Sequence, residues 1–324
     1  MLTIGVDVGG TSVRAGVVDE QGDLLDTARV ATPGGEDALE DAIAGVVAQL
    51  RNRHEVAAVG LAVAAFVGTD RRSVMFAPHL AWRASPVADR IAKRVGLPVT
   101  LEHDANAATV GEHRYGAARG ARVACLIAVG TGIGAGLLLG GDLFRGAHGV
   151  APELGHLCVV PGGRPCSCGK YGCWERYCSG TALAATAVEL LARHPSRSTV
   201  LARELSGDPG SVTGRRVAGA ARDGDPIALR ALAELARWLG EGLALVADVY
   251  DPEVVVVAGG VSGSATLFLD EAREHYARVV TGAGHRPLAR IRTAQLGDET
   301  TIVGAATLAR DARKKPGTLG GVAP

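Results

Sequence analysis

The residues best suited to chemistry are three closely spaced cysteines and a histidine upstream of them. Cys166, Cys168 and Cys173 have the spacing C-x-C-x4-C on a segment interrupted by glycines, so three thiolates can converge on one tetrahedral ion. His156 is the nearest upstream candidate for a fourth ligand, and the Pro-Gly-Gly turn after it can fold the chain back. The spacing therefore predicts a structural zinc site. The alternative is a set of reduced, partly buried cysteines without a metal.

A second candidate is the glycine-rich hairpin near the start of the chain. The sequence predicts a strand from Leu2 to Val8, a tight turn, and a second strand from Val13 to Asp19. The turn offers backbone N–H groups of glycines and the Thr11 hydroxyl to a phosphate, and the Asp7 carboxylate lies just before it. The alternative is an ordinary glycine hairpin without a ligand.

A similar strand-turn-strand pattern recurs in the middle of the chain. Arg122 to Val129 is a predicted strand, the turn contains Gly130-Thr131-Gly132, and a second glycine-containing strand follows. This layout indicates an internal duplication. No helix pattern follows the glycines, so we do not interpret them as a dinucleotide-binding fingerprint, and the sequence has no Walker A lysine motif.

Asp104 is the candidate for acid–base chemistry. It follows a predicted strand from Val99 to Leu101 and precedes a predicted helix from Asn106 to Tyr115. Open α/β sheets place ligands at the carboxyl ends of their strands, and the dipole of the helix favours a negative charge at its N-terminus. The alternative is an aspartate that caps the helix and has no chemical role.

The composition narrows the class of protein. A chain of 324 residues can form two domains with cores of their own. A formal net charge of +0 and a pI near 7.1 give no electrostatic reason to expect nucleic acid or an anionic membrane as a partner. The hydrophobic content of 47%, with 45 glycines and 4% aromatic residues, is typical of α/β proteins with many tight turns.

The sequence shows no recognisable secretory signal or membrane-spanning run, and we therefore expect a soluble, cytoplasmic protein. Met1 is followed by a predicted strand rather than by a basic region and a cleavage site, and the longest apolar runs are interrupted by glycine or charge. In a reducing compartment the six cysteines favour metal binding over disulfides. We expect Cys125, Cys158 and Cys178 to be packing residues.

The remaining pattern alternates strands and helices. Ser85 is a predicted N-cap with Pro86 at the first helical position, and Asp225-Pro226 repeats that arrangement at the start of a long helix. The other predictions are strands at 24–31, 55–63 and 253–258, helices at 37–51, 86–94, 180–193, 226–248 and 300–310, a polar connection at 195–211 and a disordered tail at 314–324.

Several of these motifs, in this order, resemble those of the ROK family of sugar kinases and sugar-responsive repressors. They are Asp7-Val-Gly-Gly-Thr-Ser, Glu102-His-Asp-Ala-Asn106, Glu153-Leu-Gly-His156, Cys166-x-Cys-Gly-x-x-Gly-Cys-x-Glu175 and Val257-Ala-Gly-Gly-Val-Ser262. Phe76-Ala-Pro-His-Leu-Ala-Trp82 and Ala294-Gln-Leu-Gly297 resemble the glucokinase branch of the family in high-GC Gram-positive bacteria. The resemblance extends over nearly the whole chain.

The resemblance implies a two-domain α/β fold of the actin-like ATPase and sugar kinase type. In this fold, duplicated mixed sheets that contain β-hairpins are flanked by helices, and nucleotide binds in the cleft between domains that close over the sugar. We expect a small domain from residues 1–115 plus 299–324, and a large domain from residues 116–298 with the zinc loop.

The resemblance also implies an ATP- and Mg²⁺-dependent kinase that phosphorylates the primary 6-position hydroxyl of glucose or a glucose-like ring, with Asp104 as general base. The implied sugar ligands are His79, His103, Asp104, Glu153, His156 and Glu175. The implied nucleotide and magnesium residues are Asp7, Gly9, Gly10, Thr11, Gly130, Thr131, Gly132, Gly259 and Gly260. Zn²⁺ would be structural, held by His156 and the three cysteines, and relatives imply a homodimer or homotetramer.

Two departures from the family pattern concern the acceptor. The family usually has asparagine at the position of His103, and its glucokinase branch usually has asparagine at the position of His79. Both asparagines belong to the sugar pocket of the family. A histidine is larger and titratable, so the two changes indicate an altered acceptor, and the alternative is neutral drift. The resemblance offers a seven-carbon cyclitol of the valiolone type as one candidate, because some kinases of actinobacterial secondary metabolism resemble glucokinases. The sequence does not decide between ATP and polyphosphate as donor.

Two functions without kinase activity remain as alternatives. Family repressors carry a helix-turn-helix segment ahead of the first hairpin, whereas here the hairpin begins at Met1, the net charge is zero and Asp104 is present. These features favour a kinase over a sugar-sensing repressor. A catalytically inactive sugar sensor is the third interpretation.

Overall fold

A computed structural model describes residues 1–193, 199–205, 212–260 and 262–314. The chain forms two compact units. Unit 1 contains Met1–Leu126, Gly136–Pro152 and the described residues from Ala294 onward, and unit 2 contains Ile127–Ala135 and Glu153–Thr293. The division expected from the sequence differs, because it assigned all of residues 116–298 to one domain.

The sheet of unit 1 begins with the predicted hairpin. Its strands are β1 (Thr3–Val8), β2 (Ser12–Val18), β3 (Leu24–Ala31), β4 (Val59–Val63) and β8 (Val99–His103), in the order β3-β2-β1-β4-β8. The pairs β1-β2 and β2-β3 are antiparallel, whereas β1-β4 and β4-β8 are parallel. The mixed sheet therefore joins a hairpin to two parallel strands, as expected.

One face of this sheet packs against α1 (Glu36–Arg51) and α2 (Val87–Val95). The alternation of side chains along a strand directs Ile4 and Leu61 into the same apolar core as Ile43 of α1 and Ile91 of α2. All four side chains are buried completely. Burial of such aliphatic side chains contributes about 1.5–3 kcal/mol each and holds these layers together.

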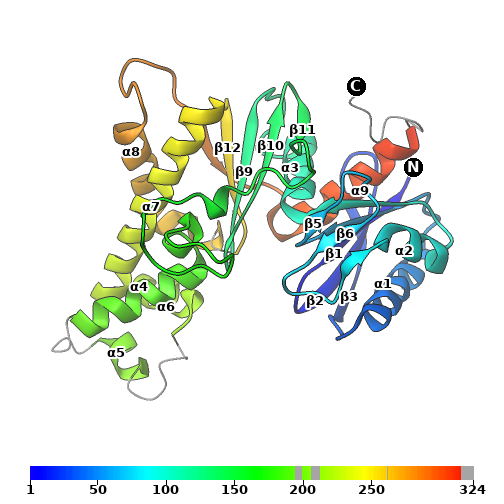
Figure 1. The fold of residues 1–324 in the computed structure, drawn as a ribbon, viewed down its shortest axis with the longest axis horizontal. Helices are drawn as coiled ribbons and strands as arrows, with labels where there is room; N and C mark the ends of the chain where they lie inside the picture. Colours follow the sequence, from blue (N-terminus) through cyan, green and yellow to red (C-terminus); the bar gives the residue numbers. More distant parts are fainter. Residues whose placement is uncertain (194–198, 206–211, 261, 315–324) are drawn as a thin grey trace. The chain divides into compact units, whose positions relative to one another are not determined.

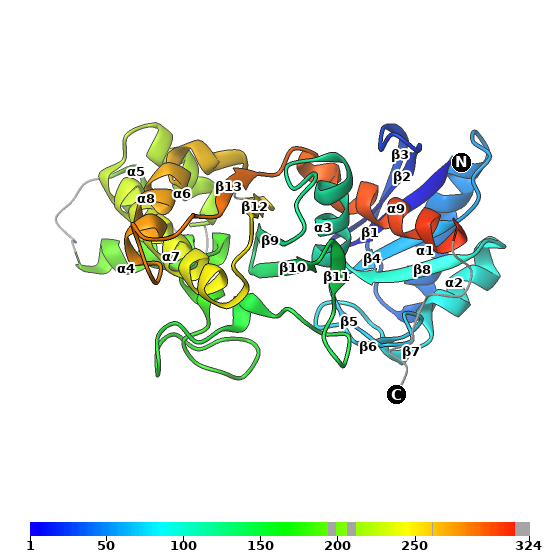
Figure 2. The same ribbon diagram turned by 90° about the horizontal axis from the view of Figure 1, so that it is seen from above.

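The opposite face packs against α9 (Thr300–Lys314), which in turn contacts α3 (Asp104–Tyr115) (Figures 1 and 2). Glycines make this close approach possible. A Cβ atom at Gly5 would lie 1.9 Å from the Ile302 carbonyl oxygen, and one at Gly60 would lie 1.9 Å from that of Ala305. Any larger residue at these two positions would push α9 off the sheet.

A second sheet has the order β11-β10-β9-β12-β13. Its strands are β9 (Ala124–Val129), β10 (Ile133–Leu139), β11 (Asp142–Phe144), β12 (Val254–Ala258) and β13 (Arg290–Thr293). The β10-β11 end belongs to unit 1 because it packs on α3: a Cβ atom at Gly136 would lie 2.1 Å from the Thr109 hydroxyl oxygen. This contact explains why unit 1 reaches beyond the predicted boundary at residue 115.

The helices of unit 2 are α4 (Gly180–Arg193), α5 (Val200–Leu205), α6 (Gly214–Arg222), α7 (Pro226–Tyr250) and α8 (Leu269–Val279). They lie together beside β12, with α7 in contact with α4, α6 and α8 (Figure 2). The predicted cap of α7 is confirmed, since the Asp225 carboxylate accepts hydrogen bonds from the amides of Ile227 and Ala228 at 2.9 and 3.1 Å. None of the described helices is long and apolar enough to cross a bilayer.

Some predicted boundaries are wrong. Ser85 is the last residue of a short strand, β7 (Arg83–Ser85), and its hydroxyl donates to Glu36 at 2.7 Å instead of capping α2. Helix α3 already begins at Asp104, and β4 begins at Val59 rather than at residue 55. Strand β7 belongs to a small sheet with β5 (Phe66–Val67) and β6 (Val74–Phe76) that the sequence did not predict.

Two predictions concern segments that the structure describes only in part. The predicted polar connection at 195–211 contains helix α5, while residues 195–198 and 206–211 lie outside the described residues. Helix α9 continues to Lys314, so the predicted disorder does not begin there, and residues 315–324 also lie outside the described residues.

Candidate active site and metal centre

The four predicted zinc ligands come together in unit 2. One donor atom from each of His156, Cys166, Cys168 and Cys173 lies within 4.8 Å of the others. The sulfurs of Cys168 and Cys173 are 3.6 Å apart, and the Cys166 sulfur is 3.7 Å from His156 Nδ1. A tetrahedral zinc with bonds of about 2.3 Å to sulfur and 2.05 Å to nitrogen requires S–S and S–N separations of about 3.8 and 3.6 Å. The donor set therefore fits Zn²⁺.

The backbone of the cysteine loop depends on two glycines. Gly169 and Gly172 have φ of 88° and 77°, which side-chain-bearing residues rarely adopt. A Cβ atom at Gly172 would also lie 1.7 Å from the carbonyl oxygen of Val160. The amides of Val159 and Val160 both donate to the Gly172 carbonyl, at 2.9 and 3.2 Å. These contacts fold the segment back, as predicted from the turn after His156.

The chemistry of the thiols also calls for a cation. Burial raises the pKa of Cys166 to about 12, and burial is also the largest cause of the raised pKa of Cys173. Thiolates are the ligands of zinc, so these two groups need a neighbouring positive charge to lose their protons. A divalent ion bound between them would supply that charge.

The zinc loop is anchored to the helices of unit 2 through Trp174. This residue lies between Cys173 and Glu175 in the short 3-10 helix Trp174–Arg176, and its indole is fully buried. The indole N–H donates to the Trp238 carbonyl of α7 at 2.7 Å, and a Cβ atom at Gly242 would lie 1.9 Å from the ring. The anchor fixes the position of Glu175.

Two carboxylates flank His156 in unit 2. Glu153 Oε2 is 3.8 Å from His156 Nε2, and Glu175 Oε1 is 3.8 Å from Nδ1. His156 and Glu175 are 26% and 14% exposed, so both can meet a ligand from solvent. Carboxylates accept and imidazole N–H donates, which suits the alternating groups of a polyol. Since Nδ1 is directed at the cysteines, Nε2 is the ring nitrogen that remains for another ligand.

The second glycine turn lies against the same cluster. Gly130 and Gly132 form a backbone hydrogen bond of 2.9 Å in the turn between β9 and β10, which confirms a hairpin. A Cβ atom at Gly132 would lie 2.3 Å from Glu175 Oε2, and the same oxygen accepts a hydrogen bond from the Ile133 amide at 3.3 Å. The exposed residue Thr131 is at the tip of the turn.

The predicted base belongs to unit 1. Asp104 is the first residue of α3 and is 37% exposed, and its Oδ1 accepts a hydrogen bond from the Ala105 amide at 2.7 Å. His103 Nε2 lies 3.2 Å from the same oxygen. The position at the carboxyl end of β8 and at a helix N-terminus is as predicted.

Asp7 lies near Asp104 and is paired with Arg14. The guanidinium of Arg14 donates two hydrogen bonds to Asp7 Oδ2, at 3.2 and 2.5 Å, and one to the Asp298 carbonyl at 3.1 Å. Burial raises the pKa of Asp7, Arg14 opposes this increase, and the negative charge of Asp104 adds to it. Asp7 is therefore close enough to Asp104 for the charge of Asp104 to act on it.

The first glycine hairpin is held by hydrogen bonds within its own backbone and by Thr32, the residue that follows β3. The amide of Gly9 donates to the Ser12 carbonyl at 3.1 Å, and Thr32 bonds to both Thr11 and Gly9. A Cβ atom at Gly10 would be 3.4 Å from that of His79, so the segment around His79 lies against one side of this turn. The turn therefore presents small residues and exposed backbone, as predicted.

Unit 1 contains a buried charged cluster around Glu102 that the sequence patterns did not predict. Glu102 is 1% exposed, and its carboxylate accepts from Arg145 at 2.7 and 3.0 Å and forms an ion pair with Arg71. Its other oxygen accepts from the Asn106 amide and from the His103 backbone amide, at 3.1 and 3.0 Å. Glu102 thus fixes the segment that carries Asp104. Its place in the Glu-His-Asp-Ala-Asn motif was the only signal for it.

The glycine pair after β12 has a structural explanation of its own. Gly259 has φ of 87°, and a Cβ atom there would lie 2.6 Å from the Val129 carbonyl. A close approach of two strand ends therefore accounts for this glycine without any ligand. Gly260 is exposed, and residue 261 of the same motif lies outside the described residues.

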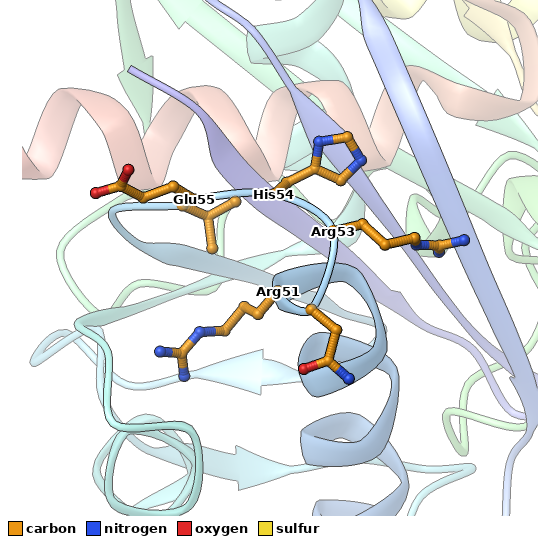
Figure 3. Close-up of a pocket in the computed structure, with 6 residues that line it drawn as sticks. Arg51, Arg53, His54 and Glu55 are labelled. Atoms are coloured by element: carbon orange, nitrogen blue, oxygen red, sulfur yellow. The ribbon is translucent and has the colours of Figure 1, made fainter.

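Unit 1 also has a surface pocket that none of the candidate site residues lines. It is open to solvent and lined by residues 51–56 at the end of α1. Figure 3 shows the side chains of Arg51, Arg53, His54 and Glu55 pointing in different directions. Arg53 and His54 each pair with Asp26 at 3.0 Å, and Arg51 donates to the Val95 carbonyl. Its cationic groups are already partnered, so we assign it no ligand.

Comparison with known proteins places this arrangement in a family. The chain is 46% identical to a glucokinase of Streptomyces coelicolor over 310 residues, which cover 96% of this chain and 98% of the relative. A crystal structure of a ROK family glucokinase from Streptomyces griseus, in complex with glucose and AMPPNP, matches with a TM-score of 0.87 and 46% identity. That match covers 96% of this chain and 100% of the other.

A more distant solved structure agrees. The ROK hexokinase from Thermus thermophilus is 33% identical, has a TM-score of 0.78 and matches over 97% of this chain and 99% of its own. These matches confirm the mixed α/β fold of actin-like sugar kinases. The model of the ROK family matches residues 3–312, and the chain belongs to the ROK family.

Proposed function

We propose that this chain is an ATP- and Mg²⁺-dependent kinase that phosphorylates the 6-position hydroxyl of glucose or a glucose-like ring, with Asp104 as general base. Transfer of a phosphoryl group to an alcohol needs a base at the hydroxyl, donors around the phosphates and a metal ion. The observation that carries the proposal is the position of Asp104, a partly exposed carboxylate at the start of α3 near Asp7.

The sugar ligands in this proposal are Glu153, His156 and Glu175 of unit 2, with His79, His103 and Asp104 of unit 1. The distance of 3.8 Å from His156 Nε2 to Glu153 Oε2 leaves room for a hydroxyl to bridge them, and Glu175 lies on the other side of the ring. Because two acceptors flank one donor, the cluster would select the orientation of a polyol ring.

The phosphates would bind to the two glycine hairpins. Gly9, Gly10 and Thr11 form one turn, and Gly130, Thr131 and Gly132 form the other, while Gly259 and Gly260 would approach the adenosine. When bound, Mg²⁺ neutralises charge on the phosphate oxygens. Asp7 suits this ion because Arg14 occupies only Oδ2, so Oδ1 can accept a hydrogen bond from a metal-bound water.

Zn²⁺ would have a structural role in this enzyme. Three cysteines and His156 complete a tetrahedral set, so no position is left for a substrate. The ion would act by holding the His156 ring in one orientation through Nδ1, with Nε2 directed at the sugar.

The relatives favour glucose as acceptor and ATP as donor, since one of them was crystallised with glucose and AMPPNP. His103 stands where the family, and His79 where its glucokinase branch, usually has asparagine, so a seven-carbon cyclitol of the valiolone type remains the alternative acceptor. We also propose a homodimer or homotetramer, which light scattering after gel filtration would measure.

The experiment that tests the function is a screen of hexoses, amino sugars and cyclitols with ATP or polyphosphate. ADP release measures turnover, and NMR of the product identifies the phosphorylated carbon. We expect ATP-dependent formation of a 6-phosphate with glucose. Turnover with a cyclitol alone would select the alternative acceptor, and the absence of turnover with every acceptor would contradict a kinase.

A further inference from the structure

His103 is placed to act on Asp104. Its Nε2 lies 3.2 Å from Asp104 Oδ1, which also accepts the Ala105 amide at 2.7 Å. Both potential donors approach the same oxygen. Among the described residues, the structure records no hydrogen-bond or ion-pair partner for Oδ2.

The backbone at His103 leaves its ring free for this role. His103 is the last residue of β8 and the N-cap of α3, with an extended backbone (φ −64°, ψ 140°) and no capping hydrogen bond from its side chain. Its amide donates to the buried Glu102 carboxylate at 3.0 Å, which fixes the backbone. The ring is 22% exposed.

We infer that His103 is a positioning residue for Asp104, an inference that rests on the proposed kinase function. In the reacting complex, His103 donates its Nε2–H to Oδ1. Because a carboxylate can rotate about its Cβ–Cγ bond, two donors on one oxygen determine which oxygen faces the acceptor alcohol. Apo hydrogen bonds at active sites often shorten and align when substrate binds.

The proton balance follows from this arrangement. The alcohol oxygen forms a bond to the γ-phosphorus as the bond from that phosphorus to the bridging oxygen of ATP breaks. The alcohol proton moves to Asp104 Oδ2, and ADP leaves with the electron pair of the broken bond. His103 keeps its own proton throughout and acts only as a hydrogen-bond donor through Nε2.

The test compares two variants that differ in one property. Gln and Met have similar lengths and shapes, but only the Gln amide can donate a hydrogen bond to Asp104. We expect H103M to lower kcat with glucose about tenfold, because a freely rotating carboxylate spends less time in the reactive orientation. H103Q should regain kcat to within about threefold of wild type, and the KM for ATP should change less than twofold in both.

A matched control is H285M, a substitution of an exposed histidine in unit 2. Thermal unfolding verifies that each variant is folded, and H103L replaces H103M if that variant is not. Equal kcat values for H103Q and H103M, or wild-type turnover in H103M, would overturn the inference while leaving the kinase function intact. A wild-type chain that phosphorylates no acceptor would instead overturn the proposed function.

Discussion

Arg145 lies 2.7 Å from the carboxylate of Glu102, although 43 residues separate them in the chain. Arg71 approaches the same carboxylate oxygen, so one buried negative charge balances two guanidinium groups. Glu102 also bonds to the amide of His103 and to the side chain of Asn106, on either side of Asp104. The geometry at the proposed base therefore depends on this buried cluster.

Replacement of Glu102 by Gln should destabilise the protein strongly. The substitution keeps the shape but leaves Arg71, which is 9% exposed, without its counter-charge. Loss of one partner of a buried ion pair costs about 3–5 kcal/mol. Urea unfolding at neutral pH measures the change, with D311N as control, since the Arg114–Asp311 pair is 49% and 40% exposed and such pairs contribute about 0–1 kcal/mol. Equal effects of the two variants would contradict a structural role for Glu102.

The buried Glu102 carboxylate should also make the stability of the folded protein depend on pH. Burial raises the pKa of Glu102, but the charges of Arg71 and Arg145 outweigh burial and the net pKa is lowered. A lowered pKa in the folded state means that Glu102 stabilises the fold above its ordinary pKa of about 4.3, and that this stabilisation is lost as the pH falls through the lower, folded-state value. Below about pH 4, Tm should therefore fall more steeply for wild type than for E102Q. Parallel curves would be inconsistent with this cause.

Removal of zinc should weaken sugar binding more than turnover. We expect one zinc ion per chain by elemental analysis, and its loss in C168S. Because His156 would lose the ligand that fixes Nδ1, the KM for glucose should rise by about tenfold while kcat changes less, and Tm should fall. C158S is the control, since Cys158 is outside the four-residue cluster. An unchanged KM after chelation would disprove the coupling between metal and sugar.

Gly132→Ala should act through Glu175. The added Cβ atom would lie 2.3 Å from Glu175 Oε2, so the carboxylate must move away from the Ile133 amide and from His156. We expect a higher KM for glucose with little loss of stability. In Gly219→Ala, a control in helix α6, the new methyl group has nothing within 4 Å. Isothermal titration with glucose would reveal the loss, and wild-type affinity in G132A would show that the carboxylate is not needed in its present position.

Local sequence patterns were sufficient for several central strands, the two glycine hairpins and the cysteine–histidine cluster. β1 and β12 are runs rich in buried β-branched residues, and the Asp225-Pro226 pair defines the start of α7 through its own hydrogen bonds. The cysteine cluster was predictable because its ligands are close in the chain and its glycines force the turns. In each case the interactions that determine the structure are local.

Long-range contacts left no such pattern. Nothing near Arg71 or Arg145 in the sequence indicates that both pair with Glu102. Ser85 and Pro86 looked like a helix start, but the serine hydroxyl bonds instead to Glu36 from a distant part of unit 1. The extent of unit 1 was missed for the same reason, because it depends on the packing of Gly136 against Thr109.

The central claim is that Asp104 takes the proton from the acceptor alcohol, and Asp104→Asn tests it most directly. The variant keeps the size of the side chain but removes the base. We predict a fall in kcat with glucose of about 10²–10⁴-fold, measured by ADP release, together with a glucose Kd within a few fold of wild type by calorimetry. A D104N enzyme that turns over at near the wild-type rate would contradict the account.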